Sequence, residues 1–106
     1  MRTTLRDVLP QRRRCETFNM RFGGQNTLFT VTVGYYADDR IGEVFIDGAK
    51  PGSEMADITR DGAVLLSLAL QHGVPLPTMR HAVCRDKADN ATTIIGAVID
   101  KMMDSV

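Results

Sequence analysis

The loop at residues 48–53 (GAKPGS) has the residue types best suited to binding an anion. Its glycines let backbone N–H groups turn toward a ligand, the helix predicted after it offers a positive dipole end, and Lys50 adds a charge. The alternative is a plain strand-to-helix turn: Glu54 and Asp57 already complement the helix end, and the spacing is not that of a Walker A loop. The candidate anion- or nucleotide-binding residues are Gly48, Lys50, Gly52 and Ser53.

Two other polar groups are candidates for binding. His72, Arg80 and His81 surround a predicted helix break, where the helix dipole favours histidine whether or not it does chemistry. Arg12, Arg13 and Arg14 form a basic patch that could bind phosphates or an acidic partner. The same residues fit equally well with a tail that only increases solubility.

The sequence indicates no catalytic residues and no metal site. No nucleophile lies near a base at a recognisable spacing. Cys15 and Cys84 form no CxxC pair, so we expect two free thiols in or near the core. No apolar run is long enough to span a bilayer and no secretory signal is present, which predicts a cytoplasmic protein without membrane contact.

Size and charge suit one small domain. The chain has 106 residues, with 13 basic and 13 acidic side chains, so no overall field favours nucleic acid. We expect residues 1–13 to be a basic flexible arm, with Pro10 stopping any short helix at residues 4–9. Residues 14–106 then form a single domain.

Hydrophobic periodicity predicts strands first and helices second. Period-2 alternation runs from residue 15 to 22, from 29 to 35 and from 41 to 46, with short turns between. A long helix follows Ser53, which is able to cap it. Its inward stripe is Met55, Ile58, Gly62, Leu65, Leu66 and Ala69, widened by Ala63, Leu68 and Leu70. Gly73 and Pro75 end it, and two shorter helices follow, with Asn90 or Thr92 as the cap of the last. The fold class is α+β: a three-stranded antiparallel meander with a long helix and two shorter helices packed on one face.

Four segments resemble the TSCPD domain family, found near the C-terminus of vitamin B12-dependent ribonucleotide reductases and as small free-standing bacterial proteins. They are RDVLPQRRR (6–14), TVTVGYY (30–36), IGEVFIDGAKPGS (41–53) and RDGAVLLSLALQHGVPLPTMRHAV (60–83). The resemblance implies a link to deoxyribonucleotide synthesis, and cobalamin only through the full ribonucleoside-diphosphate reductase. The signature that names the family is missing, because residues 91–96 read ATTIIG.

The leading hypothesis is a stand-alone, non-catalytic accessory module that binds the reductase, a nucleotide or nucleic acid. The alternative is a nucleic-acid-binding protein of double-stranded-RNA-binding type that uses the arginine-rich arm, although such domains usually place lysines where Glu54 and Asp57 stand. The open edge of a small sheet also favours self-association, with a homodimer as the expected form.

Overall fold

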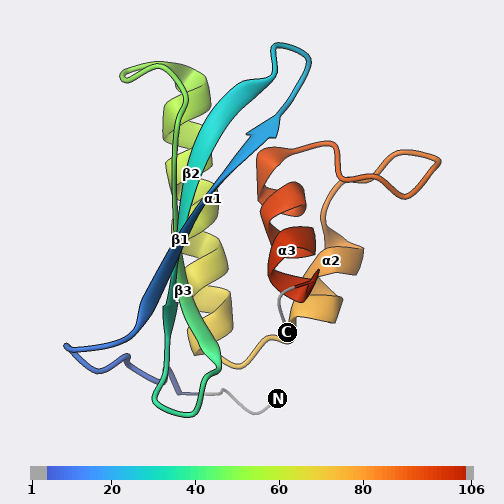
Figure 1. Ribbon diagram of the computed structural model, residues 1–106. Coiled ribbons are helices and arrows are strands. Elements are labelled where there is room, and N and C mark those ends of the chain that lie inside the picture. Colours follow the sequence, from blue (N-terminus) through green and yellow to red (C-terminus); the bar gives the residue numbers. More distant parts are fainter. Residues whose placement is uncertain (1–4, 105–106) are drawn as a thin grey trace.

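The computed structural model describes residues 5–104 and has the predicted α+β architecture. Its elements follow one another as three strands and then three helices (Figure 1). In chain order they are β1 (Cys15–Phe22), β2 (Thr27–Tyr35), β3 (Ile41–Asp47), α1 (Glu54–Gln71), α2 (Leu76–Ala82) and α3 (Ile94–Asp104).

The sheet is an antiparallel meander in the order β1-β2-β3, so β1 and β3 are its edges. Alternation gives it two different faces. Phe29, Val31 and Val33 of β2 are buried with Val44 and Ile46 of β3. These side chains share one core cluster with residues of all three helices, which lie on one side of the sheet (Figure 1). The predicted packing on one face is confirmed.

The inward stripe of α1 agrees with the predicted one only in part. The buried side chains are Thr59, Ala63, Leu66, Leu70 and Gln71, of which Ala63, Leu66 and Leu70 were predicted. The prediction was wrong for Met55, Ile58 and Leu65, which are exposed, because apolar residues cover most of the helix circumference. Small residues such as Ala63 are buried because α1 approaches β3 closely.

The ends of the helices largely follow the sequence signals. The Ala56 N–H donates to Ser53 Oγ at 3.1 Å, which confirms the predicted cap of α1. Gly73, with φ of 84°, follows the last turn of that helix as expected. For α3 we predicted Asn90 or Thr92, but the side chain at this end is Thr93, whose Oγ1 accepts from the Gly96 N–H at 3.2 Å.

Residues 5–14 form no helix or strand, but they contact the ends of β3 and α1. The Asp7 N–H donates to the Gln71 carbonyl at 2.8 Å, and Tyr36 donates its hydroxyl to the Asp7 carbonyl. The Leu9 side chain lies beside Gly42, where a Cβ on the glycine would meet it at 2.6 Å. This part of the predicted arm therefore has defined contacts, while its flexibility stays a prediction.

The loop between α2 and α3 is organised by Asp86. Its carboxylate accepts the N–H groups of Asn90 and Ala88, each at 2.9 Å. These bonds lower the pKa of Asp86 below its ordinary value of 3.8, and the bond from the Asn90 N–H has the largest effect.

A lowered folded-state pKa makes the charged Asp86 stabilising above about pH 4, and this contribution is lost as the pH falls through the folded value. We therefore expect Asp86→Asn to lower the melting temperature at pH 7 and to have little effect at pH 2. Thermal melting of both proteins at the two pH values measures this. A melting difference that is the same at both would contradict it.

Candidate functional site

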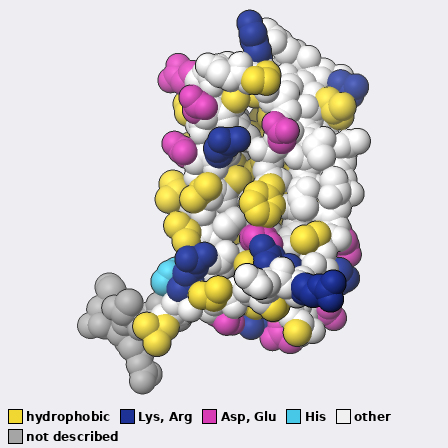
Figure 2. Space-filling model, turned by 90° about the vertical axis from the view of Figure 1, so that its left-hand side faces the viewer, with side chains coloured by type: hydrophobic (Ala, Val, Ile, Leu, Met, Phe, Trp, Pro, Cys, Tyr) yellow, Lys and Arg dark blue, Asp and Glu magenta, His cyan; other side chains and the backbone are white. Residues whose placement is uncertain are grey.

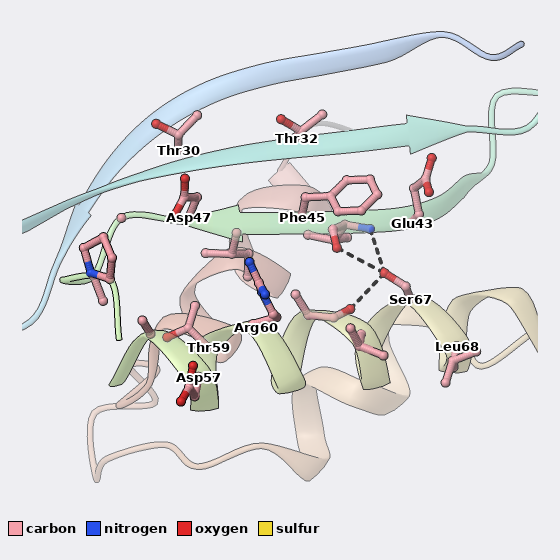
Figure 3. A pocket seen from close by; sticks show the side chains of 18 of the residues that line it. Thr30, Thr32, Glu43, Phe45, Asp47, Asp57, Thr59, Arg60, Ser67 and Leu68 are labelled. Atoms are coloured by element: carbon pink, nitrogen blue, oxygen red, sulfur yellow. Dashed lines mark hydrogen bonds between the residues drawn. The ribbon is translucent and has the colours of Figure 1, made fainter. Parts of the chain in front are cut away.

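A groove of about 740 Å³ runs between β3 and α1 (Figure 3). On the sheet side it extends over the outer face, where Thr30, Thr32, Phe45 and Asp47 project from the strands. On the helix side its lining begins at Ala56 and ends at Gln71. Because α1 rises 1.5 Å per residue, the groove is about 22 Å long.

Side chains of α1 close half of the open edge of β3. The Val44 N–H donates to Ser67 Oγ at 2.9 Å, and the Ser67 hydroxyl lies within hydrogen-bond distance of the Val44 and Ala63 carbonyls, at 3.1 and 2.8 Å (Figure 3). Gln71 Nε2 donates to the Gly42 carbonyl at 2.9 Å. The Gly42 carbonyl and both backbone groups of Val44 thus have partners from the helix, which protects this part of the edge from pairing elsewhere.

The other half of the edge stays open at Ile46. Outward-facing residues alternate along an antiparallel edge, so the N–H and C=O of Ile46 face the same way as those of Val44. Ala63 of α1 has no polar side chain and Thr59 Oγ1 is buried without a hydrogen-bond partner, so no residue of the range 5–104 bonds Ile46 on this side. The N–H and C=O of Ile46, a residue 8% exposed, therefore have no partner on this side of β3 among the described residues.

Arg60 extends from α1 toward β3 beside this open stretch (Figure 3). Its guanidinium makes no ion pair or hydrogen bond with any of the described residues. Phe45, Val64 and Leu68 border the groove with 56%, 52% and 36% of their surface exposed. Seen from the α1 side, hydrophobic side chains gather on this face of the molecule (Figure 2).

The predicted anion loop forms one end of the groove. Gly48 and Gly52 line it, whereas Lys50 is exposed and does not. The Ser53 hydroxyl donates to the Lys50 carbonyl at 2.6 Å and accepts from the Ala56 N–H, so it is already used in the turn. Anion binding by this loop stays a prediction.

Two of the three arginines in the predicted basic patch are paired with carboxylates. Arg13 forms a two-bond ion pair with Glu43, whose side chain is only 8% exposed. The hydrogen bond that Arg13 donates to the Glu43 carboxylate raises the pKa of Arg13. Arg14 bonds Glu16 at 3.2 Å and Asp39 at 2.9 Å, and Arg12 is exposed. Pairing leaves less free charge for phosphate than the sequence suggests.

The ion pair between Arg13 and Glu43 is expected to contribute to the thermal stability of the domain. Arg13→Ala leaves a carboxylate buried on the outer face without its counter-charge, which is costly. We expect a clear drop in the melting temperature, with Arg12→Ala, an exposed neighbour, as the matched control that stays at the wild-type value. Equal melting of the two variants would show that the ion pair between Arg13 and Glu43 contributes nothing to stability.

In the third predicted group, the contacts of Arg80 are the best defined, and binding by this group stays a prediction. Arg80 pairs with Asp89 at 2.8 Å and with Asp100 of α3 at 3.3 Å, so it joins α2 to the following loop and helix. His72 and His81 are exposed. Cys15 and Cys84 are free, as expected, but both are exposed rather than in the core.

The described residues contain neither a metal-binding cluster nor a membrane-spanning helix. No group of three or more His, Cys, Asp or Glu side chains in the range 5–104 is placed to hold a metal ion. The groove lining contains no histidine or cysteine, the side chains that would ligate the cobalt of cobalamin. None of the described helices is long and apolar enough to cross a membrane.

Sequence reasoning missed most of the groove. In the sequence, nothing distinguishes Arg60, Ser67 and Gln71 from other polar residues on a helix surface. Their roles follow from the position of β3 beside α1, which the sequence does not show. Phe45 gave a usable signal, since the alternation of β3 placed this large apolar side chain on the face away from the helices.

Comparison with known proteins agrees with the resemblance noted above. The profile of the TSCPD domain family matches residues 3–103. Vitamin B12-dependent ribonucleotide reductases are similar: that of Agrobacterium fabrum is 35% identical over 91 residues, covering 86% of this chain and 7% of the reductase. The reductase of Bradyrhizobium diazoefficiens is 38% identical over 71 residues, which cover 67% of this chain and 6% of the reductase. The reductase of Rhodopirellula baltica is 39% identical over 71 residues, which cover 67% of this chain and 7% of the reductase.

The chain thus spans less than a tenth of these three reductases, and no solved structure matches it. The family match extends from the residues before β1 through nearly all of α3, and so includes every element of the fold. The chain belongs to the TSCPD domain family.

Proposed function

We propose that this domain is a non-catalytic, cytoplasmic binding module that serves deoxyribonucleotide synthesis by binding a vitamin B12-dependent ribonucleotide reductase. The observation that carries the proposal is the match between nearly the whole chain and a short part of such reductases. A domain that a reductase carries within its own chain has surfaces adapted to that enzyme. A related domain is therefore suited to the same surfaces.

The chemistry of the described residues supports a binding role rather than catalysis. They contain an elongated groove with an open backbone edge and a free guanidinium, and no metal-ligating group. An exposed apolar margin beside polar groups is typical of surfaces that bind other proteins.

Nucleotide binding at the loop of residues 48–53 is the second candidate, favoured by the two glycines of this loop that line the groove. A thermal-shift screen of nucleotides tests it. A nucleotide that raises the melting temperature of the wild type but not of Lys50→Ala would place the site on the loop. A response unchanged by the substitution would remove the loop from consideration.

The proposed function itself is tested by affinity capture. The immobilised chain is incubated with the purified vitamin B12-dependent reductase encoded in the same genome, at physiological salt so that weak charge contacts are screened. Saturable retention of the reductase is expected. No retention by a chain that melts cooperatively would contradict the proposal.

A further inference from the structure

We propose that the groove between β3 and α1 binds an extended peptide segment that carries an acidic side chain. The inference rests on the proposed function and deepens it, because it identifies the surface on which the reductase would be held and the chemistry of the segment.

The shape of the groove favours an extended occupant. Its lining follows β3 from Glu43 to Asp47 and α1 from Ala56 to Gln71, a length of about 22 Å along the helix. At about 3.3 Å per residue, an extended peptide of roughly six or seven residues has that length. A compact small molecule would occupy only part of it.

The open backbone groups of Ile46 are what a peptide main chain needs. An added strand pairs through N–H and C=O groups, and Ile46 offers one of each. Ser67 and Gln71 already occupy the positions at Val44 and Gly42, so pairing with β3 is limited to one end of the groove. This restriction fixes where along the groove the peptide backbone meets the strand.

Charge defines the acidic position of the peptide. Arg60 reaches toward β3 without a partner among the described residues, and a guanidinium in a partly enclosed groove is well suited to a carboxylate (Figure 3). Asp47 and Asp57 also line the groove, nearer the loop of residues 48–53. A second acidic side chain at that end would be repelled, so one acidic residue in a set place is preferred.

Apolar side chains supply the remaining contact. Phe45 stands on the outer face of the sheet, with Val64 and Leu68 across the groove on α1. Phe45 and Val64 are about half exposed and Leu68 about a third, and a peptide side chain lying between them would remove apolar surface from water on both walls. The expected segment thus combines an acidic side chain with apolar ones.

The inference is tested with peptides tiled over the reductase sequence and probed with the purified full chain. Wild type is expected to retain a small number of peptides that contain Asp or Glu beside apolar residues. Arg60→Glu should bind these peptides at least about tenfold more weakly, because attraction becomes repulsion. Arg21→Glu makes the same charge change on an exposed residue of β1 outside the groove, and should bind as wild type does.

Two further measurements make the result decisive. Changing the acidic residue of the retained peptide to arginine should restore binding to Arg60→Glu and weaken binding to wild type. Phe45→Ser should weaken binding without reversing any charge, and thermal melting of each variant confirms that it is folded.

Failure of this inference is distinct from failure of the proposed function. If the chain captures the reductase and Arg60→Glu and Phe45→Ser capture it equally well, the groove is not the docking site and the function stands. If wild type captures no reductase, both are overturned. A free nucleotide that displaces the retained peptides and whose thermal shift is lost in Arg60→Glu would assign the groove to a small ligand instead.

Discussion

Replacing Ile99 by alanine is expected to lower the free energy of unfolding by roughly 3–5 kcal/mol. Ile99 is 1% exposed and belongs to the core cluster that joins α3 to the sheet and to the other helices. Its shortened side chain leaves a cavity that the packed surroundings fill only in part. Since domains of this size are stable by about 5–15 kcal/mol in total, the loss is a large share.

Urea unfolding followed by circular dichroism measures this change. Ile58→Ala is the matched control, because it is the same substitution at an exposed position of α1. It should lower the free energy of unfolding by no more than about 0.5 kcal/mol. Similar losses for the two variants would mean that α3 is not packed as described.

Gly48→Ala should have the second-largest effect, about 2–3 kcal/mol of destabilisation. Gly48 has a φ of 155°, which L side chains rarely adopt. A Cβ at this position would meet the Leu28 carbonyl oxygen at 2.3 Å and Phe29 Cα at 2.8 Å. Both are backbone atoms of β2, so the end of β3 must move away from the sheet.

Chemical unfolding of Gly48→Ala, with Gly24→Ala as its control, tests that account. A Cβ on Gly24 would meet nothing within 4 Å, and its change should stay within about 0.5 kcal/mol. Since Gly48 also lines the groove, Gly48→Ala is expected to weaken capture of the reductase as well. Unchanged stability would show that the strand end has room to adjust.

The strands could be predicted from the sequence because their signal is local. Phe29, Val31 and Val33 alternate with polar residues, and this alternation alone decides which face they occupy. Ser53, Gly73 and the short turns marked the element ends in the same local way. The order of strands then followed from the short connections.

The site could not be predicted, because its residues meet only through the fold. Arg13 and Glu43 lie 30 residues apart, and Glu43 is buried because Arg13 pairs with it and Gly34 leaves room for it. Ser67 and Val44 are 23 residues apart. The buried stripe of α1 also depends on the strand beside it, since an apolar residue on a broadly apolar helix does not indicate which side faces inward.

Binding between the purified chain and the purified vitamin B12-dependent reductase of the same genome is the measurement that tests the central claim most directly. Isothermal titration calorimetry at physiological salt would give both affinity and stoichiometry. The account predicts a saturable complex with a defined stoichiometry, weakened at least about tenfold by Arg60→Glu and unchanged by Arg21→Glu. The absence of any binding by the folded wild-type chain would contradict it.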